Sequence, residues 1–199
     1  WVLNEACRQS NEWQKTYGHA VKIGVNVSAI QAQQTDLVQE IIKACDRYDI
    51  SPLNIEVELT ESSIMDNLKE ISPTFSKIRD IGVTVAVDDF GTGYSSFAYL
   101  RDLPVDVLKI DRSFIMNVEA KPQDRKILKT IVNLGRSLSL DIVAEGVETQ
   151  EQADLLRSYD CHTAQGFLFA RPLPATNFET AFLSRSAGAH LVPGPRYRT

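Results

Sequence analysis

Residues 83–93, VTVAVDDFGTG, pass from an apolar run through two adjacent aspartates into a glycine-rich turn. The alternation puts the valines of the run on one face and Asp88 on the other, as in a strand with one aliphatic side. Asp89 follows where the backbone starts to turn. Two like charges repel unless a metal ion, a Lys or Arg, or water lies between them. A lone Asp-Asp at a strand end is most often a helix cap or a solvated turn, so the rest of the chain must decide.

Strand-like and helical segments alternate on both sides of this stretch. We expect strands at 21–29, 55–61, 83–90, 107–111, 141–147 and 164–169. We expect helices near 2–16, 35–48, 64–80, 124–139, 149–159 and 175–185, with a short helix at 95–104. This order predicts a parallel sheet with helices outside it, either an open doubly wound sheet or a barrel that lacks two strands.

A polar side chain lies at or near the carboxyl end of every predicted strand. These residues are Asn26, Glu58, Asp88, Lys109, Glu145 and Gln165. Each alone has a plain structural explanation, such as a core amide, a turn cap or a salt-bridged lysine. Six unrelated caps have no reason to occupy one rim, whereas (β/α)8 barrels carry their functional groups there. The pattern favours an incomplete (β/α)8 TIM-like barrel with about six of eight strands, the N-terminal strands being absent.

The composition narrows the class of protein. The 199 residues are 43% apolar and carry a net charge of −5, which argues against binding to long nucleic acids. No stretch is long and apolar enough to cross a membrane, so we expect no membrane contact from this segment. Three scattered cysteines form no disulfide framework or zinc motif. We expect a cytoplasmic location, as a separate protein or as the cytoplasmic part of a larger, membrane-anchored one.

The candidate ligands offer only oxygen atoms. Asn26, Glu58, Asp88 and Asp89 therefore favour Mg²⁺ or Mn²⁺ over zinc. Two ions at such a site suit in-line hydrolysis of a phosphoester, with Lys109 offsetting phosphate charge or orienting the attacking hydroxide. Glu145 is a candidate proton acceptor.

Six motifs occur in an order that resembles the EAL family of cyclic di-GMP phosphodiesterases. They are VNVSA (25–29), ELTES (58–62), DDFGTGYSS (88–96), LPVDVLKIDRSF (103–114), AEGVET (144–149) and QGFLFARPL (165–173). The similarity extends over about residues 1–185. It implies hydrolysis of one phosphodiester of cyclic di-GMP to linear pGpG, with two Mg²⁺ or Mn²⁺ ions.

The resemblance also implies a role for each matching residue. Asn26, Glu58, Asp88 and Asp89 would bind the metals, and Lys109 would orient the water. Glu145, supported by Glu148, would act on the metal-bound water or as general base, and Gln165 would hold a catalytic water. Glu61 would anchor the loop 89–96. Weaker candidates for substrate contact are Ser28, Asp106, Arg171 and Pro172.

One feature departs from the family pattern. The family is named after a Glu-Ala-Leu motif whose Glu binds metal, and that tripeptide does not occur in this chain. A complete barrel needs about 250 residues, and the chain begins with Trp1 rather than Met. We therefore expect residues 1–185 to be an EAL domain without its N-terminal strands, and 186–199 to be a flexible tail.

Other functions remain open at this point. The chain is alternatively a cyclic di-GMP receptor that has lost turnover, or a regulatory or dimerisation domain without a ligand. A magnesium-dependent barrel of another chemistry, such as enolate formation, shares the carboxylates and the lysine but leaves the motif series unexplained. The resemblance makes a homodimer and an upstream sensor or diguanylate cyclase domain plausible partners.

Overall fold

The computed structural model describes residues 1–199 except 19, 35, 93–96 and 185–199. The predicted tail and residues 93–96 of the predicted loop lie outside the described residues. Among the helices that are described, none has both the length and the apolar character needed to cross a membrane. Cys7, Cys45 and Cys161 are buried free thiols.

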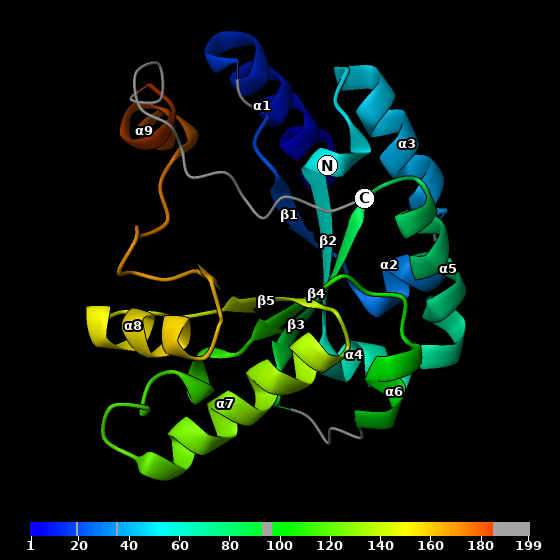
Figure 1. Cartoon of the computed structure of the whole chain (residues 1–199). Coiled ribbons are helices and arrows are strands. Elements are labelled where there is room, and N and C mark those ends of the chain that lie inside the picture. Colours follow the sequence, from blue (N-terminus) through cyan, green and yellow to red (C-terminus); the bar gives the residue numbers. More distant parts are fainter. Residues whose placement is uncertain (19, 35, 93–96, 185–199) are drawn as a thin grey trace.

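The sheet has six strands that are all parallel and lie side by side in chain order (Figure 1). They are β1 (Ile23–Asn26), β2 (Ile55–Thr60), β3 (Thr84–Phe90), β4 (Val107–Ile110), β5 (Asp141–Ala144) and β6 (Thr163–Ala164). A doubly wound sheet reverses its strand order at a switch point, and this sheet does not. The curled sheet with helices outside it is an incomplete (β/α)8 barrel, as the sequence predicts.

Helices connect consecutive strands and cover the outer face. The helices before β3 are α1 (Val2–Tyr17), α2 (Ala29–Gln34), α3 (Leu37–Tyr48), α4 (Glu61–Asp66) and α5 (Leu68–Asp80), with a 3₁₀ turn η1 (Pro52–Asn54). After β3 come α6 (Phe97–Asp102), the 3₁₀ helix η2 (Arg112–Phe114), α7 (Pro122–Ser137), α8 (Gln150–Ser158), α9 (Ala175–Phe178) and the π-helix η3 (Glu179–Leu183).

The core lies between the aliphatic face of the sheet and these helices. In β2, Ile55, Val57 and Leu59 are at most 1% exposed, while the residues between them are partly exposed. The inner face of β2 therefore carries Glu56, Glu58 and Thr60, as period-two alternation requires. In α3, Leu37, Ile41 and Cys45 recur at every fourth position and are buried against the sheet.

The C-terminal helical segment packs against α1, although the two are at opposite ends of the chain (Figure 1). The Trp13 ring lies 5.0 Å from that of Phe178, centroid to centroid. Glu179 accepts a hydrogen bond from Trp13 Nε1 at 2.8 Å.

Several predicted boundaries are wrong. The strand expected at 21–29 ends at Asn26, because Ser28 caps a helix, α2, that the sequence reading missed. The strand expected at 164–169 ends at Ala164, and the next residues turn across the backbone of Val147, to which Leu168 N–H donates. The helix expected at 64–80 begins at Glu61 and is divided at Asn67.

Candidate metal and catalytic site

Lys109 lies at the centre of a cluster of carboxylates on the inner face of the sheet. Its ammonium is 2.5 Å from Glu58 Oε2, 2.8 Å from Glu145 Oε1 and 3.2 Å from Asp88 Oδ1. These three carboxylates come from β2, β3 and the turn after β5, all at the carboxyl edge of the sheet. The structure thus brings together four of the residues that the sequence places on the rim.

A β-bulge brings Asp88 and Asp89 to the same side. Val87 is opposite Leu108 and Phe90 is opposite Ile110, so that two aspartates face the single residue Lys109. In an unbroken strand, neighbouring side chains point to opposite faces, but a bulge re-aims one of them. Asp89 has a left-handed backbone, with φ of 52°. The bulge therefore explains how two adjacent aspartates can serve one site.

The bulge produces a group of carboxylates close enough to share a cation. Oxygen atoms of Asp88, Asp89 and Glu145 all lie within 4.8 Å of one another. With Glu58, the cluster has four carboxylates, of which Glu58, Asp88 and Glu145 contact the ammonium of Lys109. The excess negative charge and the all-oxygen donor set fit hard divalent cations such as Mg²⁺ and Mn²⁺.

The electrostatics of the cluster follow from burial and crowding. Burial raises the pKa of Glu145, helped by repulsion from Asp88 and Glu58, and the attraction of Lys109 does not cancel this rise. Burial and repulsion from Asp88 and Asp111 likewise raise the pKa of Asp89. Burial alone would lower the pKa of Lys109, but Glu145 and Glu58 outweigh it and raise that pKa.

Asn26, Gln165 and Glu61 lie around this cluster. Asn26 is the last residue of β1 and is paired in register with Glu58. Gln165 directly follows β6, and its backbone N–H donates to Ala144 O, next to Glu145, at 2.8 Å. Glu61 is fully buried, and its Oε2 accepts a hydrogen bond from Gly91 N–H at 2.7 Å. That bond connects the start of α4 to the turn after the aspartates.

Other predicted residues have contacts of a different kind. Ser28 and Gln31 cap α2 reciprocally, since the Ser28 hydroxyl accepts from Gln31 N–H and the Gln31 side chain accepts from Ser28 N–H. Glu148 is exposed, and its backbone N–H donates to Gln152. The Arg171 guanidinium lies 4.4 Å from the Phe167 ring centroid, and Pro172 next to it is exposed.

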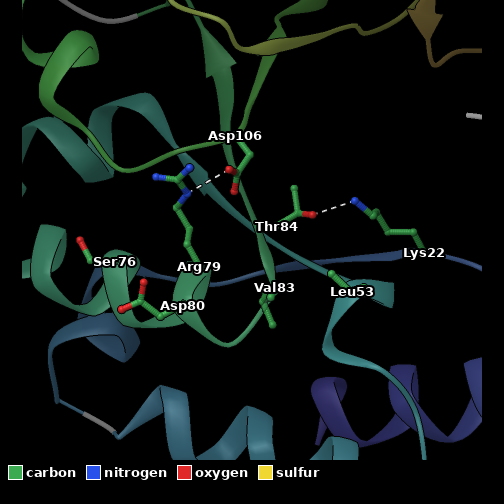
Figure 2. Close-up of a pocket in the computed structure, with 9 residues that line it drawn as sticks. Lys22, Leu53, Ser76, Arg79, Asp80, Val83, Thr84 and Asp106 are labelled. Carbon is green, nitrogen blue, oxygen red and sulfur yellow. Dashed lines mark hydrogen bonds and ion pairs between the residues drawn. The ribbon is translucent and has the colours of Figure 1, made fainter. Parts of the chain in front are cut away.

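Asp106 lies away from the cluster, at the amino-terminal edge of the sheet. It precedes β4, accepts from Arg79 Nε at 2.9 Å and accepts from Val85 N–H at 3.0 Å. It lines a pocket of about 630 Å³. In the same pocket Lys22 donates to the Thr84 hydroxyl at 2.7 Å (Figure 2). In (β/α)8 barrels this end of the strands contributes to stability, and the functional groups lie at the opposite end.

The sequence analysis did not identify Gly24, a glycine that makes room for the site. A Cβ on Gly24 would overlap Glu58 Oε1 and come within 2.9 Å of its Cδ. Gly24 therefore makes room beside β1 for one oxygen of the Glu58 carboxylate, while the other oxygen, Oε2, contacts Lys109. A lone glycine inside a strand is a signal of such close approach, and it was available in the sequence.

Comparison with known proteins identifies the family of this chain. Residues 1–172 match the model of the EAL domain. The chain is 44% identical over 176 residues to the bifunctional diguanylate cyclase/cyclic di-GMP phosphodiesterase MucR of Pseudomonas aeruginosa, covering 88% of this chain and 26% of that protein.

Solved structures of EAL-type proteins also resemble this chain. A structure of the PaMucR phosphodiesterase in complex with c-di-GMP is 42% identical with a TM-score of 0.84, covering 89% of this chain and 72% of that one. A manganese/cy-diGMP complex of Klebsiella pneumoniae BlrP1 is 25% identical with a TM-score of 0.77, covering 85% of this chain and 43% of that one. The chain spans about a quarter of the length of the curated relatives it matches.

Proposed function

Because the chain belongs to the EAL domain family, we propose that it takes part in metal-dependent hydrolysis of cyclic di-GMP to linear pGpG. The observation that carries the proposal is the cluster at the rim, where Lys109 contacts three carboxylates from three different strands or strand ends. This arrangement combines ligands for hard cations with a cation that orients a nucleophile. Several relatives and structural neighbours are named for cyclic di-GMP turnover or binding.

We assign the following roles in the reaction. Asn26, Glu58, Asp88 and Asp89 would hold two ions, Mg²⁺ or Mn²⁺. When bound, these ions supply the Lewis acidity that polarises the phosphate and makes water a stronger nucleophile.

The remaining groups act on the water and the proton. Glu145, whose pKa is raised by burial, accepts a proton from the attacking water. Lys109 donates a hydrogen bond that orients that water, and Gln165 helps to hold it. Glu148 supports Glu145 from the next turn. The water oxygen bonds to phosphorus, the bond to the 3′ oxygen breaks, and the proton ends on that oxygen, which leaves pGpG with a 5′ phosphate.

Substrate contact and assembly belong to the same proposal. Ser28, Arg171 and Pro172 lie on segments that follow the carboxyl ends of β1 and β6, and they are our candidates for contact with the dinucleotide. Asp106 has no place in this set, because it lies at the opposite edge. Glu61 anchors the turn at Gly91, and a homodimer would form across the loop that follows this turn. Placement in the cytoplasm, beside an upstream sensor or cyclase domain, completes the proposal.

A second candidate function is a cyclic di-GMP receptor without turnover. The tripeptide Glu-Ala-Leu, whose Glu binds metal in the family, does not occur in residues 1–199. Both candidates require the same dinucleotide-binding rim, and they differ only in turnover.

Chromatography of cyclic di-GMP incubated with Mn²⁺ separates the two candidates. The assay is run with the 199-residue chain and with the natural polypeptide that contains it, each beside its Lys109→Met variant. Release of pGpG that requires Lys109 supports the hydrolase. Binding of cyclic di-GMP by equilibrium dialysis, with no pGpG from either form, establishes the receptor. If the chain neither binds nor hydrolyses cyclic di-GMP, both candidate functions are contradicted.

A further inference from the structure

The 3₁₀ helix η2, Arg112–Phe114, lies between the turn that follows Asp88 and Asp89 and the turn that carries Glu145. It begins directly after β4, the strand of Lys109, and Asp111 caps it by accepting from Ser113 N–H at 3.0 Å. Because β4 lies between β3 and β5, the segment after β4 separates the turns that follow those two strands.

On one side, η2 presses against the turn after Asp88 and Asp89. A Cβ on Gly91 would lie 2.5 Å from Phe114 Cε2 and 2.7 Å from its Cζ. The edge of the ring therefore rests on the Gly91 backbone. Gly91 has φ of 98°, and Glu61 binds its N–H from another direction. The turn is thus held between the buried carboxylate and the aromatic ring.

On the other side, η2 presses against the turn after β5. A Cβ on Gly146 would overlap Arg112 Cβ and lie 3.4 Å from Arg112 Cα. Gly146 has φ of 68° and directly follows Glu145, whose N–H donates to Ile110 O at 3.0 Å. The same short element therefore touches the backbone beside Glu145 and the backbone beside the aspartates.

We propose that η2 is a spacer that sets the distance between the end of β3, which carries Asp88 and Asp89, and the turn that carries Glu145, with Phe114 as its positioning residue. The inference rests on the proposed metal site, because the carboxylate oxygens of Asp88, Asp89 and Glu145, which lie within 4.8 Å of one another, come from the two segments that η2 touches. A cation site tolerates little change in ligand separation. Residues that hold the ligands typically affect metal affinity by about 10- to 100-fold.

The test measures Mn²⁺ affinity of the metal-free 199-residue chain by electron paramagnetic resonance of free Mn²⁺, without reference to turnover. We expect Phe114→Ala to weaken Mn²⁺ binding about tenfold or more, and Phe114→Leu to retain part of the affinity. The control is Tyr159→Ala, which removes another half-buried aromatic packed on the same core, on the segment that precedes β6 and so at the edge of the sheet opposite the rim. That variant should lose stability and keep the affinity of the unmodified chain.

A double-mutant cycle tests the contact itself. Gly91→Ala should weaken Mn²⁺ binding less in the Phe114→Leu background than in the unmodified chain, because leucine lacks the two ring atoms that the new Cβ meets. If Phe114→Ala does not fold, the Mn²⁺ affinity of Phe114→Leu tests the role of Phe114 instead.

The outcomes separate this inference from the function on which it rests. An unmodified chain that binds no Mn²⁺ overturns the proposed metal site and the spacer together. An unmodified chain that binds Mn²⁺, with Phe114 variants of equal affinity or with a strictly additive cycle, overturns the spacer alone.

Discussion

Lys109→Met is the most informative single change, because one buried cation serves three carboxylates. The Lys109 side chain is 6% exposed, and those of Glu58, Asp88 and Glu145 are 12%, 14% and 17% exposed. Methionine fills a similar volume without charge. In the metal-free chain the variant therefore leaves mutually repelling carboxylates in a poorly solvated place.

The size of the effect follows from this burial. Removing one partner of a buried ion pair costs about 3–5 kcal/mol. The carboxylates sit at an open rim and regain some water, so we expect the lower end, about 3 kcal/mol. For a domain of this size, each kcal/mol lowers Tm by roughly 2–4 °C, which gives a fall of about 6–12 °C.

Urea unfolding in EDTA measures this loss, with Arg136→Met as the matched control. Arg136 also forms an ion pair, with Asp160, but the two side chains are 50% and 59% exposed, and such pairs contribute about 0–1 kcal/mol. Saturating Mn²⁺ should restore part of the loss in Lys109→Met, since divalent charge replaces the ammonium. Equal losses in Lys109→Met and Arg136→Met would refute the cluster as described.

Three further predictions concern the same site. Asp89→Asn should stabilise the metal-free chain by a few tenths to about 1 kcal/mol in urea unfolding, because it removes repulsion and asparagine tolerates the left-handed backbone, while Mn²⁺ affinity falls. Gly24→Ala should displace Glu58 and lower Mn²⁺ affinity in the same titration; unchanged affinity would show that Glu58 is free to move aside. The raised folded-state pKa of Glu145 means that the folded state holds this proton more tightly than the unfolded chain. Its contribution to stability therefore decreases as pH rises from the ordinary carboxyl pKa through the raised one, and Glu145→Gln should flatten that part of the pH profile of unfolding in EDTA.

Local sequence patterns were sufficient for the architecture. The alternation in β2 and β3 and the repeat in α3 each report which face is buried, because side-chain direction depends only on local backbone geometry. The polar residues at the ends of the predicted strands indicated where the site lies, because parallel strands all end at one edge of the sheet. The same reasoning failed at 164–169, where an apolar run leaves the sheet through a hydrogen bond to Val147, a residue distant in sequence.

The motifs and the succession of strands and helices along the chain were therefore determined by the sequence itself, through side-chain alternation and apolar periodicity. Only the tertiary structure decided how these parts act together. The bulge opposite Lys109, the packing of Phe114 on Gly91 and the ion pair of Asp106 with Arg79 each depend on contacts between separate segments. Such contacts arise when the sheet closes and several segments compete for one space, and a periodic pattern within one segment carries no information about that competition.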